Sequence, residues 1–354
     1  MFARRSMAAA QCNKNIYFFG GVGASGTESI LDISSDLYCF DTQKLKWREI
    51  EQKNLWPSKR HCTGFTTVGN KIHLWGGSSV IKINDRDHTY NFLNDFWEYN
   101  IDSNFWRCIE KSDDDSILPL KNNKPIPRYT PIFEQLSDSL IVFGGYTEDR
   151  LGKRKLNDFW IYNNQKWEEF NPFDKKEGYD LKANYPGMRY GCMSAANEDT
   201  LYICGGFSDE GDHIDIWKFN IRTMQWTILS SDVSQNIPNK RYCASFGYFN
   251  NKLILFGGRS RKNPKANYND LYEFDLTTKK WSEIYPNTRD DLYNDKAVYP
   301  AYHAKSSFCI IDNFMYIWGG EGLHGHVSDF WRLNLNSYKW ELLSPARDDD
   351  PKFW

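Results

Sequence analysis

The sequence predicts an all-β protein built from repeated, four-stranded antiparallel sheets. Two observations lead to this prediction: a Gly-Gly pair ends an apolar segment six times along the 354 residues, and aromatic residues make up 16% of the chain. Short aromatic segments separated by turn residues are typical of β-strands. A segment that recurs at a regular spacing indicates a repeat architecture rather than unrelated domains, because a single small sheet cannot bury both of its faces.

Each repeat contains four predicted strands, which we call A to D in chain order. Strand A uses small residues, as in Met7–Ala10, and strand B is the apolar segment that ends in Gly-Gly, as in Ile72–Gly77. Strand C opens with an Asp followed by aromatic residues, as in Asp95–Trp97, and strand D carries a Trp in every repeat. Tight turns such as Asn250–Asn251 join strands A and B and are typical of hairpins.

A basic residue lies sixteen positions before the first glycine of each Gly-Gly pair. These residues are Arg4, Arg60, Arg128, Arg189, Arg241 and His303. The fixed offset marks a structural unit, and we expect each basic residue at the start of strand A. Two interpretations stay open. Each Arg pairs with the Asp that opens strand C, or the guanidinium groups are free to bind a planar anion.

The pattern of Gly-Gly, aromatic strand and Trp resembles the kelch repeat, and the resemblance covers residues 4–343. It implies a six-bladed β-propeller with four antiparallel strands per blade, in one domain of residues 1–343, followed by a short tail at 344–354. It also implies that strand A is the innermost strand and that the Trp packs between blades. The expected blades span residues 4–50, 60–110, 128–170, 189–229, 241–284 and 303–343.

The connections from strand B to C, and from D to the next A, are predicted to be long loops. The B–C segments range from Phe207–Ile214 to Ser78–Asn94, and the D–A segments include Lys111–Pro127 and Phe170–Met188. In an up-and-down sheet these connections share one face, and such loops are the usual seat of binding. We expect the six basic residues at the mouth of the central channel on this face. The predicted partner-binding residues are Arg4, Arg60, Arg128, Arg189, Arg241, His303, Tyr129, Tyr190 and Tyr242.

The predicted function is that of a non-catalytic module that binds a protein or peptide ligand at the channel mouth. An acidic or carboxylate-ended peptide suits a ring of Arg and Tyr, and the resemblance to stand-alone kelch proteins implies a substrate-recognition or scaffold subunit. The alternative is an enzyme that acts on an anionic sugar, similar to the sialic acid epimerases, with His303 as base and the arginines holding a carboxylate. No cofactor is expected for the leading function.

Composition and charge argue against a nucleic-acid-binding, a membrane-spanning or a secreted protein. A net charge of −2 gives no basic field for nucleic acid, and the basic clusters near Arg150–Lys155 and Arg259–Lys265 are interpreted as mixed surface charge. No stretch approaches the ~18 consecutive apolar residues of a membrane span. The N-terminal residues lack the apolar run of a signal peptide, and the eight cysteines include no CxxC pair. We therefore expect a cytoplasmic protein without disulfides.

A weaker constellation lies in the sixth B–C segment. His324 and His326 follow Glu321, and His303 is expected on the same face. Imidazole and carboxylate groups are ligands of Zn²⁺ and Fe²⁺, but spacing within a loop fixes no coordination geometry. The prediction is that these residues hold no metal.

Overall fold

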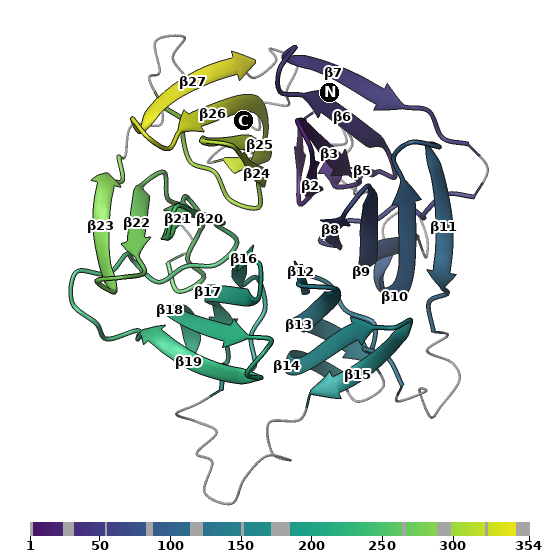
Figure 1. The fold of residues 1–354 in the computed structure, drawn as a ribbon, viewed down its shortest axis with the longest axis horizontal. Coiled ribbons are helices and arrows are strands. Elements are labelled where there is room, and N and C mark those ends of the chain that lie inside the picture. Colours follow the sequence, from purple (N-terminus) through teal and green to yellow (C-terminus); the bar gives the residue numbers. More distant parts are fainter. Residues whose placement is uncertain are drawn as a thin grey trace, which may run out of the picture.

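The computed structural model describes residues 3–23, 32–53, 55–82, 88–113, 123–149, 152–170, 185–263, 267–288, 299–322 and 325–344. Within these residues the structure is all-β, and every strand pairing is antiparallel. There are six four-stranded sheets and one three-stranded sheet. The sheets follow one another around a central axis, so that the first and the last lie side by side (Figure 1).

Each four-stranded sheet consists of the strands of one sequence repeat, in chain order. The first contains β2 (Ala8–Cys12), β3 (Asn15–Phe19), β6 (Leu37–Asp41) and β7 (Lys46–Ile50). The second contains β8 (Gly64–Val68), β9 (Lys71–Lys82), β10 (His88–Asn100) and β11 (Phe105–Glu110). The third contains β12 (Ile132–Leu136), β13 (Ser139–Asp149), β14 (Gly152–Asn163) and β15 (Lys166–Phe170).

The remaining three repeats follow the same order. The fourth sheet contains β16 (Met193–Asn197), β17 (Thr200–Ser208), β18 (Gly211–Asn220) and β19 (Gln225–Ser230). The fifth contains β20 (Ser245–Phe249), β21 (Lys252–Phe256), β22 (Leu271–Asp275) and β23 (Lys280–Tyr285). The sixth contains β24 (Ser307–Ile311), β25 (Phe314–Gly322), β26 (Gly325–Asn334) and β27 (Lys339–Ser344). The three-stranded sheet contains β1 (Arg4–Arg5), β4 (Val22–Gly23) and β5 (Asp32–Ile33).

The innermost strands surround the axis and are the predicted A strands. Strand β2 contacts β8 on one side and β24 on the other, and each further A strand contacts the A strand of the next sheet. The small residues of β2 and β16 fit this position, because six strands converge there and leave little room for large side chains.

Six core clusters fill the gaps between neighbouring sheets in the described part of the chain. One combines Tyr17 and Phe19 of the first sheet with Trp97 and Trp106 of the second. Another joins the sixth sheet to the first. The strand-D Trp therefore packs against the adjacent sheet, as expected, buried in four repeats and half-buried in the first and sixth, and its large ring supplies much of the apolar area between sheets. Lys14 and Asp312 add an exposed ion pair of 2.6 Å between the first and last repeats.

The Gly-Gly pairs allow close approach between sheets. Both glycines have positive φ in all six repeats, a conformation that side chains disfavour. A Cβ on Gly20 would lie 2.3 Å from the carbonyl oxygen of Arg60, so the first glycine packs directly on the backbone of the next repeat. The second glycine donates its N–H to the carbonyl of the next basic residue, as from Gly77 to Arg128 at 3.0 Å.

The prediction of long B–C loops is wrong for Ser78–Asn94 and Phe207–Ile214, the two segments on which it was based. Residues 78–82 and 88–94, within the Ser78–Asn94 segment, belong to the paired strands β9 and β10. Most of Phe207–Ile214 is likewise paired, between β17 and β18. The reason is that the Gly-Gly pair shifts the register without ending the sheet, so both strands continue beyond it. Most of Lys111–Pro127 and Phe170–Met188 lies outside the described residues.

Three further expectations concern the cysteines, membrane-spanning segments and the C-terminal tail. All eight cysteines are described, and none forms a disulfide. Within the described residues, no helix is long and apolar enough to cross a membrane. Of the predicted tail at 344–354, only Ser344 is described, at the end of β27.

Candidate functional site

The basic residues found at a fixed offset form buried ion pairs with the Asp that opens strand C of the same repeat. Both terminal nitrogens of Arg60 bond the two oxygens of Asp95, each at 2.7 Å. The same two-point pairing joins Arg128 to Asp158, Arg189 to Asp215, and Arg241 to Asp270. Arg4 bonds Asp36 once, at 2.7 Å, and His303 reaches Asp329 at 3.2 Å.

The offset of sixteen residues has a direct structural cause. The Arg60 guanidinium donates to the carbonyl of Gly76, the first glycine of its own Gly-Gly pair, at 3.0 Å. The corresponding bonds join Arg128 to Gly144, Arg189 to Gly205, Arg241 to Gly257, and His303 to Gly319. These five basic residues therefore tie the end of strand B to the start of strand C, whereas the Arg4 side chain bonds only Asp36 among the described residues.

Strand C completes this arrangement. In four repeats a Trp two positions after the Asp donates its indole N–H to the same carboxylate, as from Trp97 to Asp95 at 2.7 Å. The carboxylate therefore accepts bonds from both the basic residue and the Trp. In Asp95, Asp158 and Asp215 both carboxylate oxygens are bonded, which is what a buried ion pair requires, because an unpaired buried charge is strongly unfavourable. In Asp329 one oxygen accepts both bonds, and the other has no partner among the described residues.

The expectation that these six basic side chains offer free charge to a ligand is therefore wrong for the described structure. Arg60, Arg128 and Arg241 have no exposed surface, and none of the six residues lines the pocket described below. His303 is also buried, with both ring nitrogens bonded, which removes the base on which the sugar-epimerase alternative depended. Although burial favours the neutral imidazole, the adjacent Asp329 raises the pKa of His303.

The residues that follow each basic residue form a second layer, closer to the surface. The residue two positions after the basic one has φ between 51° and 63° in every repeat. These six residues are Ser6, Cys62, Thr130, Gly191, Cys243 and Lys305. Backbone hydrogen bonds join five of the six neighbouring pairs in this ring of residues, each N–H donating to the carbonyl of the preceding repeat. The bond from Ser6 to Lys305, at 2.8 Å, links the first repeat to the last.

A pocket of about 740 Å³ opens at this ring. All six ring residues line it, together with the residue after each. The side chain before the ring residue also reaches the pocket in five repeats, including the predicted Tyr129, Tyr190 and Tyr242. In the structure the three predicted tyrosines line the pocket, whereas the arginine that precedes each of them points into the sheets. The partner-binding role assigned to these tyrosines stays a prediction.

One side of the pocket is aromatic. The ring of Tyr129 lies 5.3 Å from that of Tyr146 and 6.0 Å from that of Tyr190, measured between ring centres. Tyr242 continues the series at 6.2 Å from Tyr190. Burial raises the pKa of Tyr242 to about 12, since the interactions with Arg259 and Arg261 only partly oppose it. These rings are neutral at physiological pH and offer flat apolar faces with polar edges.

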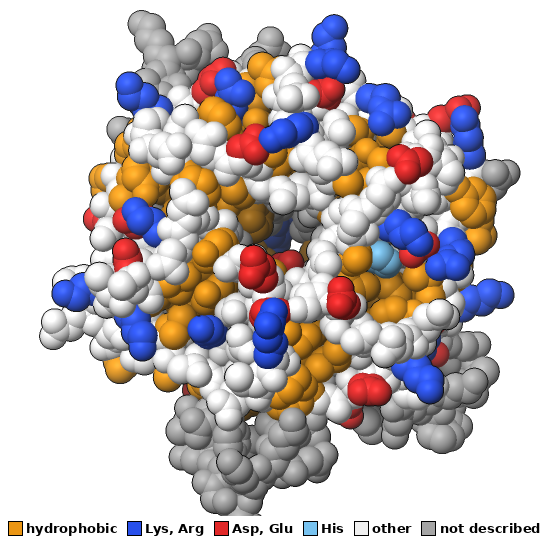
Figure 2. Space-filling view, in the orientation of Figure 1, with side chains coloured by type: hydrophobic (Ala, Val, Ile, Leu, Met, Phe, Trp, Pro, Cys, Tyr) orange, Lys and Arg blue, Asp and Glu red, His pale blue; other side chains and the backbone are white. Residues whose placement is uncertain are grey.

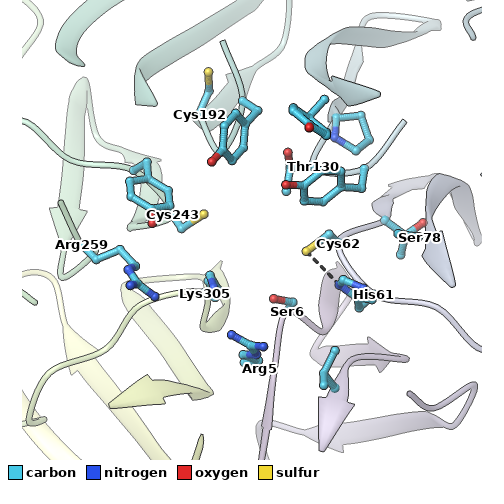
Figure 3. Close-up of a pocket in the computed structure, with 18 of the residues that line it drawn as sticks. Arg5, Ser6, His61, Cys62, Ser78, Thr130, Cys192, Cys243, Arg259 and Lys305 are labelled. Carbon is cyan, nitrogen blue, oxygen red and sulfur yellow. Dashed lines mark hydrogen bonds between the residues drawn. The ribbon is translucent and has the colours of Figure 1, made fainter. Parts of the chain in front are cut away.

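The opposite side is cationic, as Figure 3 shows for Arg5, Arg259 and Lys305. All three bond the single carboxylate of Glu321, at 3.0, 3.0 and 2.8 Å respectively. Burial would raise the pKa of Glu321, but the three cations outweigh it and lower the pKa to about 2. One carboxylate therefore neutralises one of three positive charges, and two remain.

Arg261 adds a further positive charge to the pocket, next to its aromatic side. Its guanidinium donates to the Tyr190 hydroxyl and lies 4.9 Å from the centre of the Phe207 ring. Among the ion pairs of the described residues, none involves Arg261. Away from the pocket, charges of both signs are interspersed on the face that Figure 2 shows, around the hollow at its centre.

Two of the groups considered as metal ligands, His303 and Glu321, have other partners. His324 lies outside the described residues, and Glu321 is held by the three cations. Elsewhere, His213, Asp215 and Asp232 approach one another closely enough to hold an ion. Asp215 is, however, paired with Arg189, and Asp232 accepts bonds from His213 and from the N–H groups of residues 214 and 215.

Sequence reasoning did not place the cations at the pocket: Arg259 and Arg261 were interpreted as mixed surface charge, and Arg5 was not singled out. Arg259 and Glu321 directly follow a Gly-Gly pair, and this position pairs across the sheet with the residue just after the basic one. Arg5 pairs in the same way with Val22. These positions are periodic in the sequence: one follows each basic residue, and the other follows each Gly-Gly pair. They are difficult to recognise because the residue type changes from repeat to repeat.

Comparison with known proteins agrees with this geometry. The sequence model of the KLHDC2/KLHL20/DRC7 Kelch-repeats domain matches residues 2–116, 111–290 and 228–352. A leucine-zipper-like transcriptional regulator 1 homolog of Drosophila melanogaster is 24% identical over 99% of this chain and 33% of its own length. Kelch domain-containing protein 10 of Rattus norvegicus is 24% identical over 75% of this chain and 59% of its own.

A third relative is Kelch domain-containing protein 3 of Homo sapiens, 26% identical over 62% of this chain and 55% of its own length. The chain thus spans between a third and three fifths of the length of these relatives. The family match extends over nearly the whole chain, and the repeated ion pair and Gly-Gly motif recur in all six repeats. On these grounds the chain belongs to the kelch-repeat family.

Proposed function

We propose that the chain is a six-bladed propeller that binds a protein or peptide partner in the pocket at the end of its central channel. Each four-stranded sheet is one blade, and the three-stranded sheet is an extension of the first, because all its residues belong to the first repeat. The core clusters support a closed ring, since they join every neighbouring pair including the sixth and first. Kelch-repeat domains in general bind protein partners.

The partner class is a peptide that ends in a free carboxylate or presents an acidic side chain. The observation that carries this proposal is the excess of positive charge in the pocket: Arg5, Arg259 and Lys305 share the one carboxylate of Glu321. A charge-assisted hydrogen bond to a desolvated carboxylate is worth about 1.5–3 kcal/mol. Arg261 supplies another donor whose planar group suits bidentate contact with a carboxylate.

The aromatic side of the pocket gives the rest of the peptide a surface to pack against. Tyr129, Tyr190 and Tyr242 combine a flat apolar face with a hydroxyl, which suits peptide backbone and small side chains. A volume of about 740 Å³ lies within the range of ~300–1,000 Å³ typical of small-ligand sites. The pocket therefore fits a few terminal residues of a peptide rather than a folded surface.

We further propose that the chain acts as a recognition or scaffold subunit in a reducing, cytoplasmic compartment. Eight cysteines without a disulfide support a reducing compartment. The proposed recognition role uses no catalytic group, since the channel-mouth residues supply charge and aromatic surface. The blade boundaries given under Sequence analysis are part of the same proposal.

The experiment is a selection from a random peptide library with free C-termini, with the purified chain as bait. A selected peptide is then synthesised as the free acid and as the C-terminal amide, and both are titrated by fluorescence polarisation. We expect the amide to bind about tenfold more weakly, and Arg261→Glu to weaken the acid to a similar degree. Arg222→Ala is the matched control, because Arg222 lies exposed in the C–D turn at the opposite end of its sheet. Equal binding of acid and amide would contradict the proposal.

A further inference from the structure

Cys62 occupies a distinct position in the pocket. It is the ring residue of the second repeat, with φ of 51°, and its side chain is half-buried. Figure 3 shows its sulfur directed toward the centre of the opening, which Arg5, Lys305 and Arg259 border. The thiol is therefore accessible from the same space that the proposed peptide would fill.

His61 is the immediate partner of this thiol. Its Nδ1 atom lies 3.3 Å from the Cys62 sulfur, and the His61 side chain is 9% exposed. The other ring nitrogen, Nε2, is buried and has no hydrogen-bond partner among the described residues. An imidazole with a free nitrogen beside a thiol is the arrangement that removes a thiol proton and stabilises the thiolate.

The surroundings of Cys62 favour the thiolate. Burial would raise the pKa of the thiol, but His61, a hydrogen bond with Ser6 and the charge of Lys305 outweigh it and lower the pKa to about 7. Cys243, the ring residue of the fifth repeat, has a Tyr in place of the preceding His, and burial raises its pKa to about 12. The two cysteines share backbone position and pocket, so Cys243 is a matched internal control.

We propose that Cys62 is a site of mixed-disulfide formation with small disulfides that carry carboxylates, of which oxidised glutathione is the probe. The carboxylates bind the positive charges of Arg5, Arg259 and Lys305, and this places the disulfide against the Cys62 sulfur. Because modification puts a carboxylate-bearing peptide into the pocket, it would also compete with the peptide of the proposed function. The reactivity itself does not rest on that function.

The reaction is a thiol–disulfide exchange. His61 accepts the thiol proton, and the Cys62 thiolate attacks one sulfur of the small disulfide. A bond forms between that sulfur and Cys62, the original S–S bond breaks, and the other half leaves as a thiolate that takes a proton from His61 or water. Cys62 is oxidised from thiol to disulfide, and the leaving half is reduced to a thiol.

The test is intact-mass spectrometry of the full chain, incubated at pH 7 with oxidised glutathione, followed by peptide mapping. We expect the first adduct on Cys62, formed at least about tenfold faster than any adduct on Cys243. Cystamine, a small disulfide that carries two ammonium groups, should react with Cys62 more slowly than oxidised glutathione does. Faster reaction with cystamine, or a first adduct on another cysteine, would overturn the proposal.

Single substitutions separate the contributions of Cys62, Cys243 and His61 to the rate of adduct formation. Cys62→Ser should abolish the first adduct and Cys243→Ser should leave its rate unchanged, with folding followed by melting temperature. His61→Gln should slow the adduct about tenfold, because it removes the proton acceptor. An unchanged rate in His61→Gln would contradict the role of the pair. If Cys62→Ser does not fold, the adduct map and the His61→Gln rate still decide the question. Since no library peptide is used, these results are independent of the binding experiment.

Discussion

The two layers at the mouth of the channel differ in how they use the same repeat. In the deeper layer, Arg128 and its equivalents repeat almost without change, and every basic side chain is bonded to the Asp of its own repeat. In the outer layer, the residues change from tyrosine in the third, fourth and fifth repeats to cations in the first, fifth and sixth. The comparison teaches that a residue type repeated six times reports on the architecture, whereas variation between repeats marks the part of the surface that distinguishes this chain.

The largest effect is expected where the deeper layer is broken. Asp270→Ala should lower the free energy of unfolding by about 3–5 kcal/mol, because it leaves the Arg241 charge buried without a carboxylate. The pair is among the most buried, with Arg241 0% and Asp270 1% exposed. Denaturant unfolding followed by tryptophan fluorescence measures this change. A loss below about 1 kcal/mol would mean that the pair is no more than a solvated surface contact.

The second effect is the pH dependence of the reactivity of Cys62 in the outer layer. The rate of Cys62 alkylation by iodoacetamide should fall about tenfold per pH unit below the thiol pKa of about 7 and level off above it. The groups facing the thiol are His61, Ser6 and Lys305, together with Tyr129 and Cys243 across the ring. Lys305→Met should move the midpoint to higher pH. A midpoint near that of an ordinary free thiol would show that the ring provides no stabilisation of the thiolate.

The sequence predicted the scaffold well because its signals are local and repeated. The Gly-Gly pairs, the Asp of strand C and the Trp of strand D each correspond to one bond or contact in the structure, such as Gly76 to Arg60. The pocket was predicted less well. The turn after each basic residue has positive φ, so the arginine enters the sheet while its neighbours face the channel. A spacing pattern does not reveal this reversal, and Arg5 was therefore overlooked beside Arg4.

The sixth repeat allows the deeper layer to be tested with pH. His303 replaces the arginine, and Asp329 raises the pKa of this imidazole in the folded state. The stabilisation from this pair is therefore fully present below the pKa of the unfolded chain and is lost as pH rises through the folded pKa. His303→Arg should remove this dependence, because guanidinium keeps its charge. Unfolding free energies of both proteins between pH 5 and pH 9 provide the measurement, and identical profiles would contradict the assignment.

The smallest effect on stability is expected for an outer-layer residue, Arg261. Its variant tests most directly whether the outer layer serves binding and not folding. Arg261→Ala should change the free energy of unfolding by no more than about 0.5 kcal/mol, because no carboxylate among the described residues depends on it. The same variant should weaken a selected free-acid peptide about tenfold, and added salt should reduce its effect, since screening weakens interactions between exposed charges. Chemical unfolding and fluorescence polarisation at two ionic strengths measure the two quantities. A large loss of stability with unchanged affinity would show that Arg261 supports the fold and does not bind the peptide. The distinction between a structural deeper layer and a binding outer layer would then be wrong for Arg261.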